Sequence, residues 1–120
     1  HTRYGTVTGV QTCALPISLH PSPDAAAYGA AKAGLNSLTQ SFAHALGPTV
    51  RVNCIVAGPF LTDISKAWDL EAFEASQEGN RAIPRGGDPA EIVGAALYFA
   101  SPTSSFTTGT LVTVDGGGRR

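Results

Sequence analysis

Tyr28 and Lys32 are the residues of this 120-residue chain whose types and spacing suit catalysis. Side chains four positions apart lie on one face of a helix, about one turn from each other. A free phenol titrates near pH ~10 and is a weak base at neutral pH, whereas a neighbouring ammonium favours its ionised form. The pair therefore suits proton transfer to or from an alcohol oxygen, with Tyr28 as general acid/base and Lys32 as the activating charge. Because the same spacing often arises by chance, this interpretation needs support from further motifs.

A long helix is predicted to position this pair. From Ala25 to Leu46, apolar residues recur at the helical interval of three or four. Asp24 can cap the start of this helix, and Gly47 and Pro48 end it. The recurring apolar residues are Ala31, Leu35, Leu38, Phe42 and Leu46.

Two further helices are predicted downstream. A short one is expected around residues 69–77. The other starts at Asp88, which can cap it, with Pro89 in its first turn and Glu91 able to reach back to the cap amide. This helix is predicted to end near Ala100.

Two strands alternate with these helices. Residues 49–58 show the apolar pattern of a strand buried in a parallel sheet, and residues 110–118 resemble a strand that ends in a glycine cluster. Strands joined by helical crossovers are parallel, so the fold class is α/β. Two parallel strands cannot bury both of their faces, and the pattern therefore indicates the carboxy-terminal fragment of a doubly wound parallel sheet.

Four segments resemble, in this order, the carboxy-terminal half of the short-chain dehydrogenase/reductase family. They are YGAAKAGL (28–35), VRVNCIVAGPFLTD (50–63), RAIPRGGDPAEIVGAALYFASP (81–102) and SSFTTGTLVTVDGGG (104–118). The resemblance implies a Rossmann fold, NAD or NADP as cofactor, and hydride transfer to or from a small alcohol or carbonyl substrate. It gives Tyr28 and Lys32 the catalytic roles described above and makes both cofactor-binding, with Lys32 on the nicotinamide ribose.

The resemblance also implies cofactor contacts after the first predicted strand. In the family a Pro-Gly turn is followed four residues later by a threonine that meets the nicotinamide carboxamide. Ala57, Gly58 and Thr62 stand at these places, so Gly58 and Thr62 are candidate cofactor-binding residues. Ala57 departs from the family's proline and removes its rigidity from the turn. Thr62 has a second interpretation, as a helix-cap or turn hydroxyl.

The family's hydroxyl donor is missing from its usual place, thirteen residues before the tyrosine, where this chain has Leu15. Ser18 and Ser22 lie at other spacings and are interpreted as loop residues. Residues 1–17 instead resemble a translated sequencing adapter, whose reading Val-Thr-Gly-Val-Gln-Thr-Cys-Ala-Leu-Pro-Ile equals residues 7–17. The chain is therefore divided into a non-native segment, 1–17, and the carboxy-terminal part of a Rossmann-type domain, 18–120.

Composition excludes several classes of function. The net charge is −1 and 14% of residues are charged, which does not favour a nucleic-acid partner. Apolar runs are shorter than a membrane span and no leader opens the chain, so a soluble, cytoplasmic protein is expected. Cys13 and Cys54 form no metal or disulfide framework, and Cys54 is expected in the core. His20 and His44 have no partner at ligand spacing, and no metal site is predicted.

Three hypotheses follow. In the first, the chain is part of an NAD(P)-dependent oxidoreductase and is inactive by itself, because the phosphate-binding glycine motif and the hydroxyl donor are absent. In the second, it is a non-catalytic fragment that associates with full-length subunits; family members are commonly homotetramers, in which the helix predicted at 25–46 often packs at an interface. In the third, residues 60–80 form a substrate lid. Its aromatic residues either line a pocket or simply cover the core; they are Phe60, Trp68 and Phe73.

Overall fold

The computed structural model describes residues 7–14 and 23–118. From Ala25 onward the elements follow the predicted order of helix, strand, helix, helix and strand, with short 3-10 turns between them. In chain order they are β1 (Val7–Ala14), η2 (Pro23–Ala25), α1 (Ala26–Leu46), β2 (Val50–Ala57), η3 (Asp63–Ala67), α2 (Leu70–Gln77), η4 (Pro89–Ile92), α3 (Val93–Ala100), η5 (Pro102–Ser104) and β3 (Leu111–Val114).

The strands form a parallel sheet with the order β1-β2-β3. β1 runs beside β2 from the pair Val7 and Val50 to the pair Ala14 and Ala57, and β3 pairs with the carboxy-terminal half of β2. The prediction of only two strands is therefore wrong, because β1 lies in the segment assigned as non-native. That segment is rich in Val and Thr, which favour strands, and the open edge of β2 offers unpaired backbone groups to it. The predicted parallel arrangement is confirmed.

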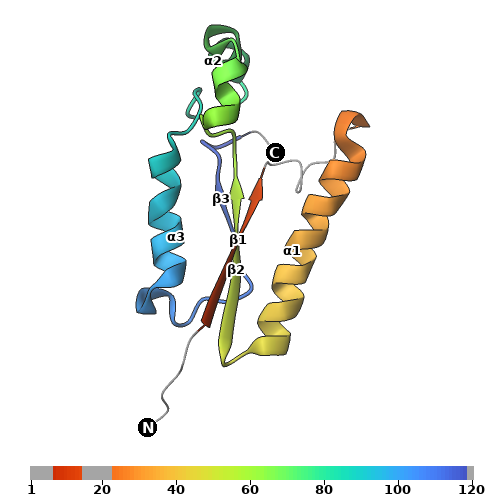
Figure 1. Cartoon of the computed structure of the whole chain (residues 1–120), viewed down its shortest axis with the longest axis vertical. Coiled ribbons are helices and arrows are strands. Elements are labelled where there is room, and N and C mark those ends of the chain that lie inside the picture. Colours follow the sequence, from red (N-terminus) through yellow and green to blue (C-terminus); the bar gives the residue numbers. More distant parts are fainter. Residues whose placement is uncertain (1–6, 15–22, 119–120) are drawn as a thin grey trace.

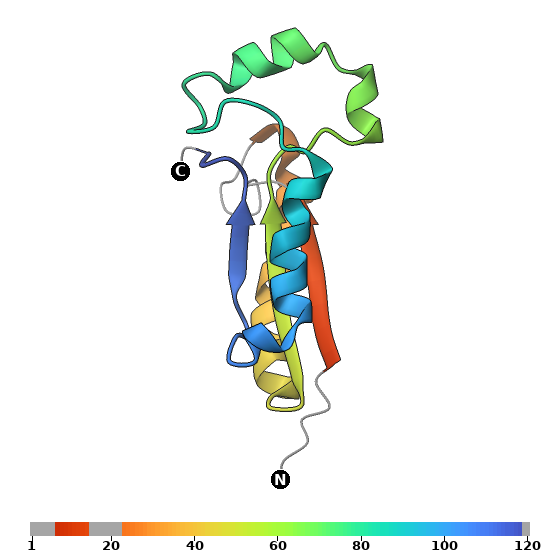
Figure 2. The same cartoon turned by 90° about the vertical axis from the view of Figure 1, so that its left-hand side faces the viewer.

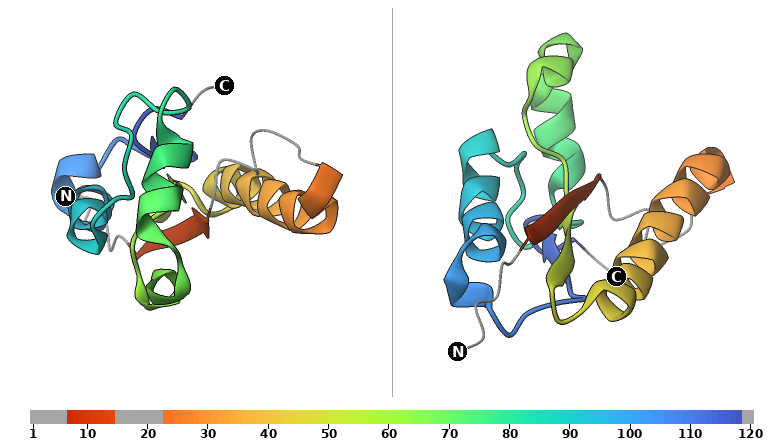
Figure 3. Two further views of the ribbon diagram at one scale, coloured as in Figure 1. Left: turned by 90° about the horizontal axis from the view of Figure 1, so that it is seen from above. Right: turned by 60° about the horizontal axis from the view of Figure 1, so that its bottom comes forward.

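Two helices sandwich the sheet. α1 lies along one side of the strands and α3 along the other (Figure 1), and the same three layers are visible from above in Figure 3. β2, the middle strand, is consequently buried from Arg51 to Ala57. A parallel sheet covered on both faces by helices is the α/β arrangement that the sequence predicts.

The middle of the core is small and apolar. Cys54 and Val56 are completely buried and pack against Leu35 of α1 and Leu111 of β3. The prediction that Cys54 is a core residue is thus confirmed. At the other end of β2, the buried Arg51 donates hydrogen bonds to the Phe99 carbonyl (2.9 Å) and to Ser104 Oγ (2.7 Å), which joins β2 to the end of α3.

α1 differs from the prediction at its start and on its inner face. Its N-cap is Ala25, which makes no side-chain capping bond, so the predicted cap at Asp24 is wrong. The residues of α1 that are buried are small or polar, and the helix thereby approaches β2 closely. The apolar residues Leu38, Phe42 and Leu46 remain 46%, 45% and 44% exposed. The buried ones are Gly29, Asn36, Thr39 and Ala43.

The chain between β2 and α3 projects past the carboxyl ends of the strands. Figure 2 shows η3 and α2 in an arch beyond the sheet, with both feet of the arch at this edge. The Trp68 and Phe73 rings pack within it, with centroids 5.1 Å apart. Asp69 caps α2 by accepting a hydrogen bond from the Ala72 amide at 3.1 Å. Nowhere in residues 7–14 and 23–118 is a helix long and apolar enough to cross a membrane.

Candidate functional site

Tyr28 and Lys32 lie together near the amino end of α1. The Lys32 ammonium nitrogen is 5.4 Å from the centroid of the Tyr28 ring, within the range of a cation–π contact. Tyr28 is 42% exposed. α1 runs opposite to the strands, so its amino end is on the side of the molecule where β1 and β2 end (Figure 1). Ligands of open α/β sheets bind at this carboxyl edge.

Gly58 opens the turn that follows β2. Its amide donates to the Val114 carbonyl at 2.8 Å, and the residue is buried. A Cβ at this position would lie only 2.6 Å from the Cα of Asp115. The absence of a side chain therefore lets the turn pack against the end of β3, a role that the sequence alone did not indicate.

Thr62 follows at the exposed end of the same turn. Its carbonyl accepts hydrogen bonds from the Ser65 amide (2.9 Å) and the Ser65 hydroxyl (2.6 Å), which start η3. The Thr62 side chain makes no capping hydrogen bond. Its hydroxyl is therefore not used in the way that the helix-cap interpretation requires.

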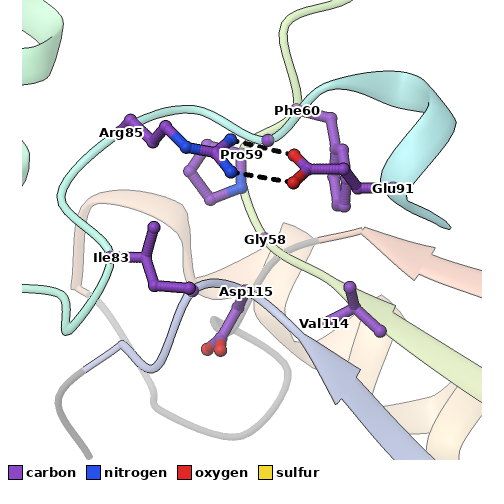
Figure 4. Close-up of a pocket in the computed structure, with 10 residues that line it drawn as sticks. Gly58, Pro59, Phe60, Ile83, Arg85, Glu91, Val114 and Asp115 are labelled. Atoms are coloured by element: carbon purple, nitrogen blue, oxygen red, sulfur yellow. Dashed lines mark hydrogen bonds and ion pairs between the residues drawn. The ribbon is translucent and has the colours of Figure 1, made fainter.

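A cavity of about 120 Å³ lies beside this turn, between the ends of β2 and β3 and the loop before η4. Figure 4 shows the side chains of Arg85 and Glu91 pointing toward each other at its rim, with Asp115 on the opposite side. Arg85 Nη1 and Nη2 donate to the two carboxylate oxygens of Glu91 at 2.9 and 2.8 Å, a bidentate ion pair. Apolar groups of Phe60 and Ile83 line the remainder.

Glu91 also completes the predicted capping box. Its Oε2 accepts from the Asp88 amide at 2.7 Å, and the Asp88 carboxylate accepts from the Ala90 amide at 2.8 Å. The hydrogen bonds from Arg85, followed by the one from the Asp88 amide, lower the pKa of Glu91 to about 2. The same carboxylate raises the pKa of Arg85. Glu91 as a capping residue is confirmed, whereas the sequence analysis missed Arg85, which stands six positions away across an irregular loop.

The glycine cluster that follows β3 forms a turn. Gly116 and Gly117 have φ angles of 70° and 71°, in the left-handed region that favours glycine. Their carbonyls accept hydrogen bonds from the Ile83 amide (2.9 Å) and the Ala82 amide (3.1 Å). The Arg81 guanidinium donates to the Asp115 carbonyl. The segment Arg81–Ile83, where the chain returns from the arch, is thus hydrogen-bonded to the residues that follow β3.

Some of the sequence predictions fall outside the described residues. Leu15, Ser18, His20 and Ser22 all lie in the undescribed stretch 15–22, so the place of the missing hydroxyl donor stays a prediction. Within residues 7–14 and 23–118, no group of three or more His, Cys, Asp or Glu side chains could hold a metal ion.

Comparison with known proteins decides the family. A family model described as "Enoyl-(Acyl carrier protein) reductase" matches residues 10–118. The chain belongs to the short-chain dehydrogenase/reductase family. An uncharacterized oxidoreductase of Mycobacterium tuberculosis is 44% identical over 93 residues, which are 77% of this chain and 35% of the relative.

Solved structures of this family agree with the fold. A 7α-hydroxysteroid dehydrogenase complexed with NADH and 7-oxo glycochenodeoxycholic acid superposes with a TM-score of 0.80 at 30% identity, covering 95% of this chain and 44% of the other. An NADPH-bound short chain oxidoreductase from Pseudomonas aeruginosa, with an atypical catalytic centre, gives a TM-score of 0.78 at 30% identity, covering 96% and 46%. The chain spans less than half the length of the curated relatives it matches, from 35% to 45%.

Proposed function

We propose that the chain is the carboxy-terminal part of an NAD(P)-dependent oxidoreductase that transfers hydride between the cofactor and a small alcohol or carbonyl substrate. The observation that carries this proposal is the Lys32 ammonium beside the Tyr28 ring, at the carboxyl edge of the sheet in a member of this family. The intact protein would be a cytoplasmic homo-oligomer, with a tetramer as the family's common form.

The donor groups at this edge fit the nicotinamide half of the cofactor. Lys32 offers three N–H donors that suit the ribose hydroxyls, and the Thr62 hydroxyl, which caps no helix, suits the carboxamide. Gly58 lets the turn that carries Thr62 pack against the end of β3. The phosphate half would be held by residues of another segment, because no glycine-rich loop follows a strand near the start of this sequence.

Tyr28 moves the proton in the proposed reaction. In reduction, its hydroxyl gives a proton to the carbonyl oxygen as the carbonyl carbon accepts hydride, and in oxidation the phenolate takes the proton from the alcohol. The Lys32 ammonium stabilises the phenolate by its charge. When bound, the nicotinamide supplies or accepts the hydride. Tyr28, at 42% exposure, is accessible to a substrate arriving at this edge.

The 120-residue chain by itself is proposed to be inactive. A serine that polarises the substrate oxygen and a phosphate-binding loop would come from the native amino-terminal half. We further propose that residues 1–17 are foreign to the protein and originate from a sequencing adapter. Backbone pairing of β1 with the open edge of β2 does not require a native sequence there. Genomic DNA read upstream of codon 18 tests this origin, and a natural reading frame encoding residues 1–17 would refute it.

The experiment for the function uses the full-length protein, meaning residues 18–120 preceded by their native amino-terminal half. Oxidation of NADH or NADPH is followed with a panel of small ketones, and the reverse reaction with the matching alcohols. Turnover with the parent and its loss in Tyr28→Phe support the proposal. A parent that binds neither cofactor, although it folds, would exclude the proposed function.

A substrate lid formed by residues 60–80 is a subordinate proposal. The arch of η3 and α2 projects past the carboxyl edge of the sheet (Figure 2). The side chains of Ile64 and Trp68 on this arch are 76% and 40% exposed. Such an apolar surface suits contact with a substrate that enters at this edge. Trp68→Ala is expected to raise the KM for the substrate while the KM for the cofactor stays unchanged. Equal changes in both would argue against a lid.

A further inference from the structure

The turn from Gly58 to Thr62 follows Ala57, the last residue of β2, and is hydrogen-bonded to the loop Arg85–Asp88. We propose that the Arg85–Glu91 ion pair is a positioning element for this turn: it holds the loop Arg85–Asp88, and this loop holds the turn in the shape that the cofactor meets. The inference rests on the proposed function, because that function supplies the cofactor. The contacts between the loop and the turn are those of this structure.

The backbone joins the loop to the turn at a single residue. The Gly87 amide donates to the Pro59 carbonyl at 2.9 Å, and the Gly87 carbonyl accepts from the Leu61 amide at 2.8 Å. Phe60 and Gly87 form a parallel bridge between these two bonds. Because both polar groups of Gly87 bind the turn, a shift of Gly87 would move the turn or break both bonds.

The side chains of the turn leave the loop little space. A Cβ on Gly86 would lie 2.7 Å from the Leu61 side chain, and a Cβ on Gly87 would lie 2.7 Å from the Phe60 ring. The loop and the turn are thus in close packing along two consecutive residues of the turn, Phe60 and Leu61. Packed surfaces of this kind transmit a displacement rather than absorb it.

The ion pair fixes the loop from both ends. Glu91 binds the amide of Asp88 at 2.7 Å and both terminal nitrogens of Arg85. Arg85 Nη1 also donates to the Gly86 carbonyl at 2.9 Å, next to the residue that binds the turn. The side chains of Arg85 and Glu91 are 48% and 45% exposed, so their charges add little to global stability. Their contribution is geometric, since a planar guanidinium and a carboxylate in bidentate contact define one orientation.

The test compares Arg85→Ala with Lys66→Ala in the full-length protein. Arg85→Ala removes the pair and leaves the capping box of Asp88 and Glu91 in place. Lys66→Ala removes another exposed ion pair, Lys66 to Asp63 at 2.7 Å, which lies on the arch and is the matched control. Arg85→Lys keeps the positive charge but cannot make the bidentate contact of a guanidinium. It replaces Arg85→Ala if that variant does not fold.

Two readouts are needed, and one of them does not depend on activity. For Arg85→Ala, we expect amide exchange at Leu61 and Gly87 to rise about tenfold while the Gly58 and Cys54 amides, bonded to Val114 and Thr110, keep their rates. We also expect the KM for NAD(P)H to rise roughly 3–10-fold with kcat within about twofold, since the lost order affects binding. Arg85→Lys should lie between the parent and Arg85→Ala, and Lys66→Ala should leave the exchange rates of all four amides unchanged.

The outcomes separate this inference from the proposed function. Unchanged exchange at Leu61 and Gly87 would overturn the inference, and so would faster exchange at all four amides, which indicates a global loss of stability. Faster exchange at Leu61 and Gly87 with an unchanged cofactor KM would show that the pair orders the turn without positioning the cofactor, and would also overturn it. A parent without turnover would instead refute the proposed function, while the exchange data still decide whether the pair holds the turn.

Discussion

The two sides of the candidate site are built in different ways. On one side, the turn after β2 has backbone hydrogen bonds to the loop before η4, at Gly87, and to the last residue of β3, Val114. On the other side, the amino end of α1 carries Tyr28 and Lys32, whose described contact is with each other. The geometry of the turn is therefore fixed by hydrogen bonds within this chain, whereas the described contact at the helix end joins Tyr28 and Lys32 to each other.

We expect this structural difference to separate the residues that affect cofactor binding from those that affect proton transfer. The turn that carries Gly58 and Thr62 depends on local packing, so variants that disturb it should affect stability and cofactor affinity together. The groups proposed to move the proton act through their chemical reactivity and not through packing. Their variants should therefore lower the reaction rate and leave the fold intact. The predictions that follow test this separation, from the largest effect to the smallest.

Tyr28→Phe should give the largest effect. In the full-length protein we expect kcat to fall about 10²–10⁴-fold, because the ring stays and only the proton-transferring oxygen is removed. Cofactor affinity, measured by fluorescence titration with NADH or NADPH, should change less than about twofold. Turnover within a few-fold of the parent would contradict the role of Tyr28.

Lys32→Met should lower both rate and affinity. The substitution removes a ribose donor and the positive neighbour of Tyr28 together, and charge-assisted hydrogen bonds are worth about 1.5–3 kcal/mol, or roughly 10–100-fold in affinity. Steady-state kinetics should therefore show a lower kcat and a higher KM for the cofactor. If neither changes, Lys32 is a surface residue whose contact with the Tyr28 ring has no catalytic consequence.

Gly58→Ala tests the enclosed side. Its Cβ would lie 2.6 Å from the Asp115 Cα, so the turn and the end of β3 must separate. Overpacking of this kind costs about 1–3 kcal/mol. We expect a lower melting temperature of the full-length protein and a weaker affinity for the cofactor. An unchanged melting temperature would mean that the turn is free to move, in conflict with its enclosure.

Gly34→Ala is the counterpart on the open side. Gly34 lies in α1 with nothing within 4 Å of its Cβ position, so alanine should stabilise the helix by about 1 kcal/mol through its higher propensity. A higher melting temperature is expected. A lower one would show that another segment or subunit packs against this face of α1 in the intact protein, as the proposed homo-oligomer allows.

Sequence reasoning predicted well those features that depend on local patterns. The helix Ala26–Leu46, the strand Val50–Ala57 and the capping box of Asp88 and Glu91 have periodicity or spacing that specifies them. It failed at β1, because pairing with an open strand edge depends on what lies beside it in space and not on a local signal. Neither the Arg85–Glu91 pair nor the packing of Gly58 on Asp115 could be predicted, since both require knowledge of the loop path.

The pH dependence of the Arg85–Glu91 pair gives the smallest effect. The pKa of Glu91 is lowered from 4.5 to about 2, because Arg85 and the Asp88 amide bind its ionised form. A group whose pKa is depressed in the folded state stabilises the protein above its ordinary pKa and loses this contribution as the pH falls through the folded value. The melting temperature of the parent minus that of Glu91→Gln should therefore be constant from pH 7 to about pH 5, and should shrink toward zero near pH 2. The Arg85 guanidinium is charged over this whole range, so the protonation of Glu91 is the step that removes the ion pair. A difference that disappears already above pH 5 would indicate that the carboxylate is not held by the bidentate contact, and would weaken the contrast between the enclosed and the open side of the site.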